Sequence, residues 1–216
     1  MHSLVSSSLP EHNHHEPQAT APKMASRKLL VCSIGNPGSA YRNTRHSAGH
    51  SILELLRESL QFPTFSAERG YNGGLLSRSS YDDTYTLFQS GSLMNVSGKP
   101  VKTAWQAFQR ELPSQEERER ALLVVLHDEL EKPLGQVKLK KTGSPAGHNG
   151  LISIIAQLHT KDFLRLGIGI GRPVSHESDV VAKYVLGKFT PRERDVLESQ
   201  SLEKILQQLK QISEMP

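Results

Sequence analysis

Short apolar segments alternate with segments of helical periodicity along this chain of 216 residues. Residues 29–34 and 121–126 are almost wholly apolar, and each segment is followed by polar or turn-forming residues, as in strands that are buried on both faces. We predict further strands at residues 85–89, 136–141 and 164–170, and a strand, a turn and a strand within residues 65–80.

Between these strands, apolar residues recur every three to four positions, which predicts helices. The helices are expected to begin between Asn43 and Ser47, at Ser97, near Leu151, at Asp179 and at Thr190, the last one running from Arg192 to about Ile212. The charged run at residues 115–120 is typical of a solvated helix or loop. Strands that alternate with helices predict an α/β sandwich, and the expected hairpin at residues 71–89 makes its sheet mixed.

The first 26 residues differ in composition from the rest, because they carry Ser, Pro and His with few large apolar side chains. We predict that residues 1–26 are a disordered extension and that residues 27–216 form one domain. The extension holds three closely spaced histidines, His12, His14 and His15. A flexible tail is a better interpretation of them than a metal site. No Arg precedes Arg27, and Glu11 and Glu16 are present, which argues against a mitochondrial address. We expect a cytoplasmic protein, with a mitochondrial location as the alternative.

The composition excludes several classes of protein. No apolar run approaches the length needed to span a membrane, and the single cysteine, Cys32, allows neither an internal disulfide nor a cysteine-rich zinc cluster. A reducing compartment is therefore expected. The formal charge of +4 and a pI near 9.2 weakly favour an anionic partner.

Polar side chains follow several of the predicted strands. They are Asn36, His46, Asn95 next to the apolar Met94, Asp128, and His148 with Asn149. Because ligands of open α/β sheets gather at the carboxyl ends of the strands, these groups are expected to share one cleft. As alternatives, His46 can simply cap the helix that follows it, and Met94 can be part of the apolar core.

The absence of several known catalytic motifs narrows the chemistry that these polar residues can perform. The sequence has no nucleophile elbow, no Walker lysine loop and no dinucleotide fingerprint after its first strand. His46 and His50 have the spacing of a zincin pair, but no glutamate follows His46, so we predict no metal. A histidine with carboxylate and amide partners can deprotonate water and stabilise an oxyanion, which fits direct hydrolysis of an activated ester. His46 is the expected catalytic residue.

Several motifs in this order resemble the bacterial-type peptidyl-tRNA hydrolase family. They are Ile34-Gly-Asn-Pro-Gly, Thr44-Arg-His, Leu93-Met-Asn-Val-Ser-Gly, His127-Asp-Glu, Gly147-His-Asn-Gly-Leu, Gly169-Ile-Gly and Val185-Leu-Gly-Lys. The resemblance runs from about Lys28 into the final helix. It implies a three-layer α/β/α sandwich around a mixed, largely parallel sheet. It also implies a metal-independent, monomeric enzyme without a cofactor that hydrolyses the ester between a peptide and tRNA and so releases tRNA for translation.

The resemblance also implies roles for individual residues. His46 is expected to take a proton from water while Asp128 holds its ring. The residues expected to bind the peptide and the terminal adenosine are Asn36, Tyr41, Met94, Asn95, His148 and Asn149. Lys138 and Lys140 lie on one face of a predicted strand and are candidates for tRNA phosphate contacts, although a solvated strand face is the alternative.

The sequence departs from the family pattern at a few positions. Ser47 stands where the family usually has Asn, Leu93 replaces Phe, residues 144–146 replace part of a glycine-rich loop, and Gly167 stands where many members carry Arg. The base and its carboxylate remain, so we expect catalysis. Two other interpretations stay open: a tRNA-binding or RNA-binding module whose catalysis has weakened, and a metal-independent amidohydrolase or peptidase of similar fold.

Overall fold

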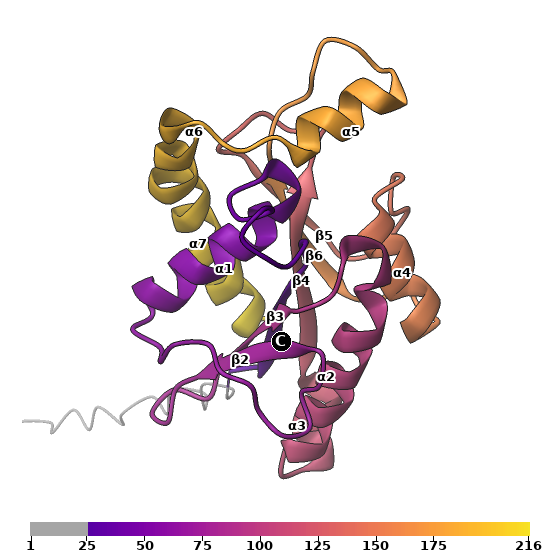
Figure 1. Ribbon diagram of the computed structural model, residues 1–216. Helices are drawn as coiled ribbons and strands as arrows, with labels where there is room; N and C mark the ends of the chain where they lie inside the picture. Colours follow the sequence, from indigo (N-terminus) through magenta and orange to yellow (C-terminus); the bar gives the residue numbers. More distant parts are fainter. Residues whose placement is uncertain (1–25) are drawn as a thin grey trace, which may run out of the picture.

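The structure, a computed structural model, describes residues 26–216, so the prediction of an N-terminal extension lies almost entirely outside the described residues. A six-stranded sheet forms its centre, with the strand order β2-β3-β1-β4-β6-β5 (Figure 1). The strands are β1 (Leu29–Ser33), β2 (Gly74–Arg78), β3 (Tyr85–Ser90), β4 (Leu122–Glu129), β5 (Val137–Lys140) and β6 (Leu164–Gly169). The four inner strands are parallel, and the edge strands β2 and β5 are antiparallel to their neighbours. The prediction of a mixed, largely parallel sheet is confirmed.

Helices cover both faces of this sheet, as Figure 1 shows. The helices and helical turns are η1 (Arg45–Ser47), α1 (Ala48–Ser59), η2 (Met94–Val96), α2 (Gly98–Glu111), α3 (Gln115–Arg120), α4 (Asn149–Leu158), α5 (Ser178–Leu186), α6 (Pro191–Val196), η3 (Leu197–Ser201) and α7 (Leu202–Ser213). One buried apolar cluster joins the sheet to α1 and α7, and a second joins it to α2 and α4. The three-layer α/β/α sandwich is therefore confirmed.

The central strand β1 shows why the sheet lies between two helical layers. All five of its residues are buried, since successive side chains of a strand point to opposite faces. Leu29 and Val31 belong to the cluster under α1 and α7, whereas Leu30 and Cys32 belong to the cluster under α2 and α4. Each fully buried aliphatic side chain of this kind contributes about 1.5–3 kcal/mol of apolar burial.

Gly49, in the first turn of α1, allows this helix to approach the sheet very closely. A Cβ atom at this position would lie 2.5 Å from the Leu126 carbonyl oxygen and 2.9 Å from the Ile34 carbonyl oxygen. No residue with a side chain fits there without displacing backbone. The turn that carries His46 immediately precedes α1, so this contact fixes the turn against the carboxyl ends of β1 and β4.

Some of the local predictions are wrong. Residues 65–80 contain one strand, β2, rather than two, because the chain turns at Glu68 after a single bridge between Ser66 and Leu76. The helix α2 does begin after Ser97, as predicted, but the Ser97 hydroxyl makes no capping hydrogen bond. Instead, the Gly98 amide donates to the Ser153 hydroxyl, 3.0 Å away.

The C-terminal helix departs from the prediction in one respect. Its first helix, α6, follows Thr190 as predicted, and Thr190 and Glu193 form a capping box there. The helix then passes through one π-helical turn, η3, before it continues as α7. Within residues 26–216, no helix is long and apolar enough to cross a bilayer.

Candidate active site

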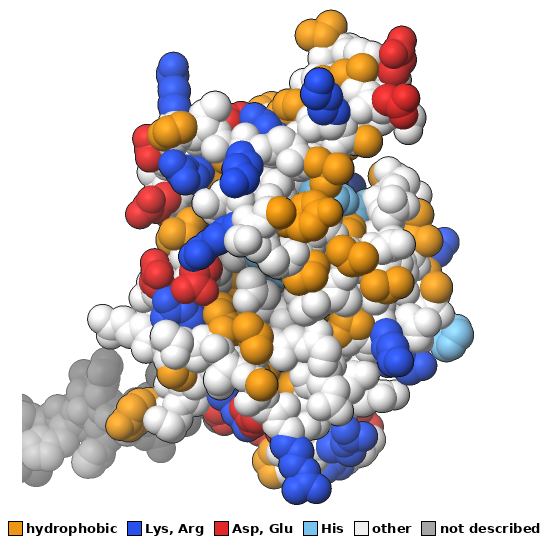
Figure 2. Space-filling model, in the orientation of Figure 1, with side chains coloured by type: hydrophobic (Ala, Val, Ile, Leu, Met, Phe, Trp, Pro, Cys, Tyr) orange, Lys and Arg blue, Asp and Glu red, His pale blue; other side chains and the backbone are white. Residues whose placement is uncertain are grey.

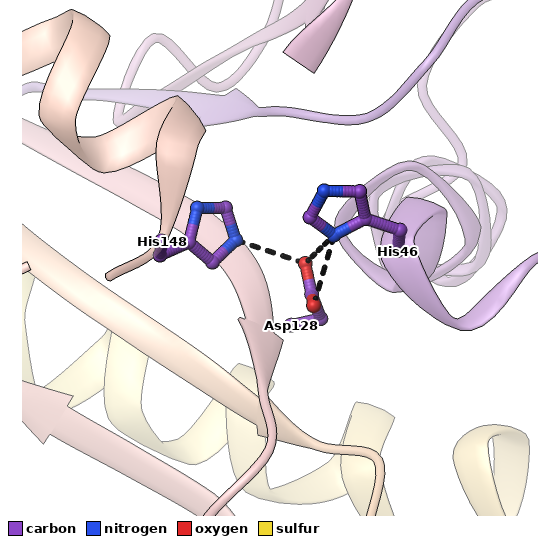
Figure 3. Close-up of side chains that lie close together, drawn as sticks. All are labelled: His46, Asp128 and His148. Atoms are coloured by element: carbon purple, nitrogen blue, oxygen red, sulfur yellow. Dashed lines mark hydrogen bonds and ion pairs between the residues drawn. The ribbon is translucent and has the colours of Figure 1, made fainter. Parts of the chain in front are cut away.

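Three side chains from distant parts of the sequence meet at the carboxyl end of β4. His46 lies in η1, Asp128 is the penultimate residue of β4, and His148 immediately precedes α4. The Nδ1 atom of His46 lies 3.0 Å from both carboxylate oxygens of Asp128, and the Nε2 atom of His148 lies 2.9 Å from Oδ1 (Figure 3). The sequence predicted this convergence of His46 with Asp128, and the structure places both there.

The hydrogen bonds assign the tautomers of the two histidines. A carboxylate only accepts, so His46 donates through Nδ1 and its Nε2 atom keeps a lone pair. Figure 3 shows that Nε2 points away from Asp128. His148 accepts from the Leu151 amide through Nδ1 at 3.4 Å and therefore donates to Asp128 through Nε2. Asp128 thus holds two imidazoles in fixed orientations.

Burial and charge shift the pKa values of Asp128 and His46 in opposite directions. Burial alone would raise the pKa of Asp128, but the positive charge that His148 carries when protonated and its hydrogen bond, together with those of His46, hold the pKa of this carboxyl well below its usual range. Burial lowers the pKa of His46, but the hydrogen bond and negative charge of Asp128 outweigh it and raise this pKa above its ordinary value. The carboxylate is therefore ionised near neutral pH, and the pKa of His46 lies above that of a free imidazole.

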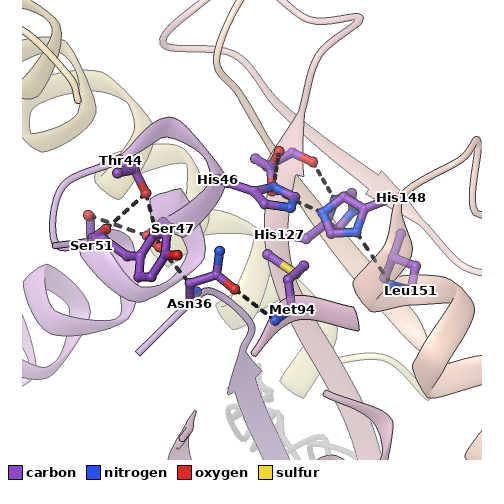
Figure 4. A network of polar contacts seen from close by, with 11 residues as sticks. Asn36, Thr44, His46, Ser47, Ser51, Met94, His127, His148 and Leu151 are labelled. Carbon is purple, nitrogen blue, oxygen red and sulfur yellow. Dashed lines mark hydrogen bonds and ion pairs between the residues drawn. The ribbon is translucent and has the colours of Figure 1, made fainter. Parts of the chain in front are cut away.

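A second network holds Asn36 beside the histidines (Figure 4). The Oδ1 atom of Asn36 accepts from the Met94 amide at 2.8 Å, which ties the β1–η1 loop to η2. The backbone amide of Asn36 donates to the Ser47 hydroxyl at 3.3 Å, and Thr44 donates to the same hydroxyl at 3.2 Å. Because Oδ1 is occupied, the amide NH₂ group of Asn36 is the part of this side chain that remains for a ligand.

The other predicted site residues surround this pair of networks. Asn95 is exposed in η2, Asn149 is exposed at the start of α4, and η2 packs against α4. Met94 is 4% exposed, so it serves the core as well as the site. Tyr41 and Asn36 line a neighbouring cavity of about 740 Å³ that also extends along α1 and η3. In Figure 2, histidine surface is visible in a hollow between the positions of α5 and α4, with apolar side chains around it.

The sequence and the structure were each compared with those of known proteins, and both comparisons point to one family. The family model described as peptidyl-tRNA hydrolase matches residues 30–215. The chain belongs to the peptidyl-tRNA hydrolase family. A peptidyl-tRNA hydrolase of Haemophilus influenzae is 40% identical over 176 residues, which cover 81% of this chain and 84% of that protein. One from Synechococcus is 38% identical over 179 residues and covers 82% of each chain.

Solved structures give the same result. The crystal structure of peptidyl-tRNA hydrolase from Acinetobacter baumannii is 29% identical to this chain, with a TM-score of 0.66, and the match covers 89% of this chain and 97% of that one. An Arg119Gln mutant of that enzyme matches at 31% identity and a TM-score of 0.67, over 89% and 95% of the two chains. The predicted family is therefore confirmed.

The two lysines that are candidates for tRNA contacts differ in their surroundings. Both lie on β5, where Lys138 is exposed. Lys140 is half-buried, and its ammonium lies 2.7 Å from the Glu129 carboxylate. Lys138 is directly opposite Gly167 on β6, and a Cβ at Gly167 would lie 3.1 Å from the Glu129 Cβ. Lys138 thus offers an exposed charge, whereas Lys140 offers one that a carboxylate partly neutralises.

Sequence reasoning missed the part played by Arg45. Its guanidinium forms two hydrogen bonds to Glu193, at 2.8 and 3.0 Å, donates to the Lys188 carbonyl and lies 4.5 Å from the centre of the Tyr184 ring. This arginine links the turn that carries His46 to the C-terminal helices. In the sequence, this arginine was noted only as part of the Thr44-Arg-His motif. Its pairing with a residue 148 positions away left no local signal in the sequence.

Proposed function

We propose that this protein hydrolyses the ester bond between a peptide, or an N-blocked amino acid, and tRNA, with water activated by His46. The observation that carries the proposal is the hydrogen bond from His46 Nδ1 to Asp128, which leaves the Nε2 lone pair to accept a proton. An intact base and its carboxylate also favour an enzyme over a binding module that has lost catalysis.

The reaction needs one proton acceptor and no covalent intermediate. His46 Nε2 takes a proton from water as the water oxygen bonds to the ester carbonyl carbon, and the carbonyl oxygen becomes an oxyanion. The bond from that carbon to the ribose oxygen then breaks, and the proton on Nε2 passes to the leaving oxygen. Asp128 stabilises the imidazolium that exists between these steps.

Amide side chains suit the substrate side of this reaction because they donate and accept without changing the charge of the site. We assign Asn36, Asn95 and Asn149 to the peptide backbone, the water and the oxyanion. The free NH₂ of Asn36 supports this assignment, since its oxygen is already bound to the Met94 amide. Tyr41 and Met94 contact the peptide or the terminal adenosine, and His148 maintains the orientation of Asp128.

The partner in this proposal is peptidyl-tRNA, and its phosphates meet the basic strand β5. Lys138 is the stronger candidate because it is exposed, and Lys140 is available to a phosphate only when it gives up part of its contact with Glu129. We further propose that the enzyme acts as a cytoplasmic monomer and that its hydrolysis needs no metal ion.

The decisive assay follows release of tRNA from N-acetyl-aminoacyl-tRNA by the full chain in the presence of EDTA. We expect hydrolysis that EDTA does not reduce. Tight tRNA binding with no hydrolysis would favour the weakened binding module, and hydrolysis of uncharged peptide amides in place of the tRNA ester would favour the amidohydrolase.

A further inference from the structure

The two histidines and the carboxylate of the candidate site are also residue types that can bind a metal ion. The donor atoms that His46, Asp128 and His148 can offer all lie within 4.8 Å of one another. They come from three separate segments, η1, β4 and the residue before α4, so the fold holds them together independently of local sequence. Two imidazoles and one carboxylate match the three protein ligands of many zinc sites, in which a fourth position stays open.

We propose that His46, Asp128 and His148 bind a divalent transition-metal ion, with Zn²⁺ as the best fit, and that the bound ion inhibits the enzyme. The binding stands on the arrangement of the three side chains alone. The inhibition rests on the function proposed above, because it assumes that His46 acts as the base.

The distances suit such an ion after a small adjustment. In a tetrahedral site with bonds of about 2.0–2.2 Å, neighbouring ligand atoms are roughly 3.3–3.6 Å apart. The two imidazole nitrogens already lie 3.0 and 2.9 Å from the Asp128 carboxylate, so these pairs need only open slightly. The two imidazole donor atoms lie within 4.8 Å of one another and must come somewhat closer together. The carboxylate supplies one negative charge to the cation.

The position of the ion explains why it inhibits. Nδ1 is the His46 nitrogen that faces Asp128, so an ion bound by these donors lies on the Nδ1 side of the ring and not on the Nε2 side (Figure 3). Coordination through Nδ1 displaces the proton there, and the neutral ring then carries its proton on Nε2. His46 can no longer accept a proton from water, although the cleft itself stays open. The proton that leaves His148 Nε2 moves by way of solvent to the Nδ1 atom of the same ring, which then no longer accepts from the Leu151 amide.

The choice of metal follows from the donor set. Two imidazole nitrogens favour Zn²⁺ and other late first-row ions, whereas Mg²⁺ prefers a shell of oxygen ligands and waters. Mg²⁺ is therefore a matched control ion, and we expect it neither to bind this cluster nor to inhibit through it.

The binding test needs a background without the histidines of the N-terminal segment, since a chain with His12, His14 and His15 can bind Zn²⁺ there. The starting protein is the full chain with these three and His2 changed to Ser. Calorimetric titration with Zn²⁺, without tRNA, is expected to give one ion per chain. His148→Asn and Asp128→Asn should each weaken this binding by at least about 100-fold.

His159→Asn is the matched control, because His159 is an exposed histidine at the end of the same helix. Its backbone is left-handed, with φ of 58°, which asparagine adopts readily. This variant should bind Zn²⁺ as the background protein does. Circular dichroism and thermal unfolding establish that each variant is folded. If either His148→Asn or Asp128→Asn fails to fold, the other still tests the site.

The outcomes separate binding from function. No Zn²⁺ binding by the background protein, or equal binding by folded His148→Asn and Asp128→Asn, would overturn the metal site. The inhibition test adds Zn²⁺ to the hydrolysis assay, where loss of activity should follow the calorimetric occupancy and be reversed by EDTA. Undiminished hydrolysis by the zinc-loaded protein would overturn the inhibition. A protein that hydrolyses no ester without zinc would refute the proposed function, and calorimetry would still decide the metal site.

Discussion

Replacing Asp128 with asparagine removes one negative charge and keeps nearly the same shape. The carboxylate accepts from His46 at 3.0 Å and from His148 at 2.9 Å, and its side chain is only 3% exposed. An amide has one oxygen, so its NH₂ group must face one of the two rings. Where it faces His46, the imidazole is driven to the tautomer with its proton on Nε2, which cannot act as a base.

The size of the effect follows from these contacts. A hydrogen bond to a charged group contributes about 1.5–3 kcal/mol, and each ~1.4 kcal/mol is a factor of ten in rate. The loss of imidazolium stabilisation alone therefore lowers kcat/KM by roughly 10- to 150-fold. The wrong tautomer adds to this, which gives an expected loss of about 10²–10⁴ for Asp128→Asn.

The same substitution should change the pH dependence. A general base works when it is deprotonated, and the pKa of His46 is raised above 6.5, so kcat/KM of the unsubstituted enzyme should fall as the pH drops through a value above 6.5. Burial lowers the pKa of His46, and the Asp128 charge counteracts this. When that charge is removed, the pKa of His46 falls. The acidic limb of the residual activity should therefore move to lower pH.

The assay is the pH profile of kcat/KM for N-acetyl-aminoacyl-tRNA hydrolysis by the two proteins. Glu129→Gln is the matched control, because it neutralises the next carboxylate on β4, which faces Lys140 and not His46. Its acidic limb should stay in place. A folded Asp128→Asn variant with undiminished kcat/KM, or with an unshifted acidic limb, would refute the pairing of His46 with Asp128 as the catalytic unit.

Four further substitutions test the fold and the tRNA surface. Gly49→Ala should lower the Tm strongly, since its Cβ would lie 2.5 Å from a backbone oxygen, and an unchanged melting curve would contradict this close approach. Arg45→Lys should lower the Tm by about 2–8 °C, because lysine cannot replace the paired hydrogen bonds and the ring contact, and calorimetry measures the shift. Lys138→Ala should weaken tRNA binding and reduce its salt slope by about 1 with the Tm unchanged, whereas Lys140→Ala should also lower the Tm because it leaves Glu129 unpaired. Filter binding measures the salt slopes. Equal slopes for the unsubstituted protein, Lys138→Ala and Lys140→Ala would show that β5 is not part of the tRNA-binding surface.

The sequence was informative where local pattern determines structure. Residues 29–33 and 122–126 are apolar enough to require burial on both faces, and this predicted the two central parallel strands. The polar residues that follow each strand, Asn36 and Asp128 among them, meet because parallel strands end at one edge of the sheet. The motif resemblance supplied the pairing of His46 with Asp128, which pattern alone left open.

Other features depend on contacts that no local pattern carries. The segment before β2 looked like a strand, but a turn at Glu68 diverts it after one bridge. The π-helical turn at η3 adds a residue to one turn of an otherwise regular amphipathic helix, and periodicity does not reveal such an insertion. The ion pair of Arg45 with Glu193 joins residues far apart in sequence, so it could be seen only in the folded chain.

The central claim is that His46 is the base that activates water. The measurement that tests it most directly is the rate of N-acetyl-aminoacyl-tRNA hydrolysis by His46→Ala, with EDTA present and with the fold checked by circular dichroism. Removal of the only proton acceptor in the mechanism should lower kcat by about 10³-fold or more while the protein stays folded and binds tRNA. Turnover close to that of the unsubstituted protein would contradict the account.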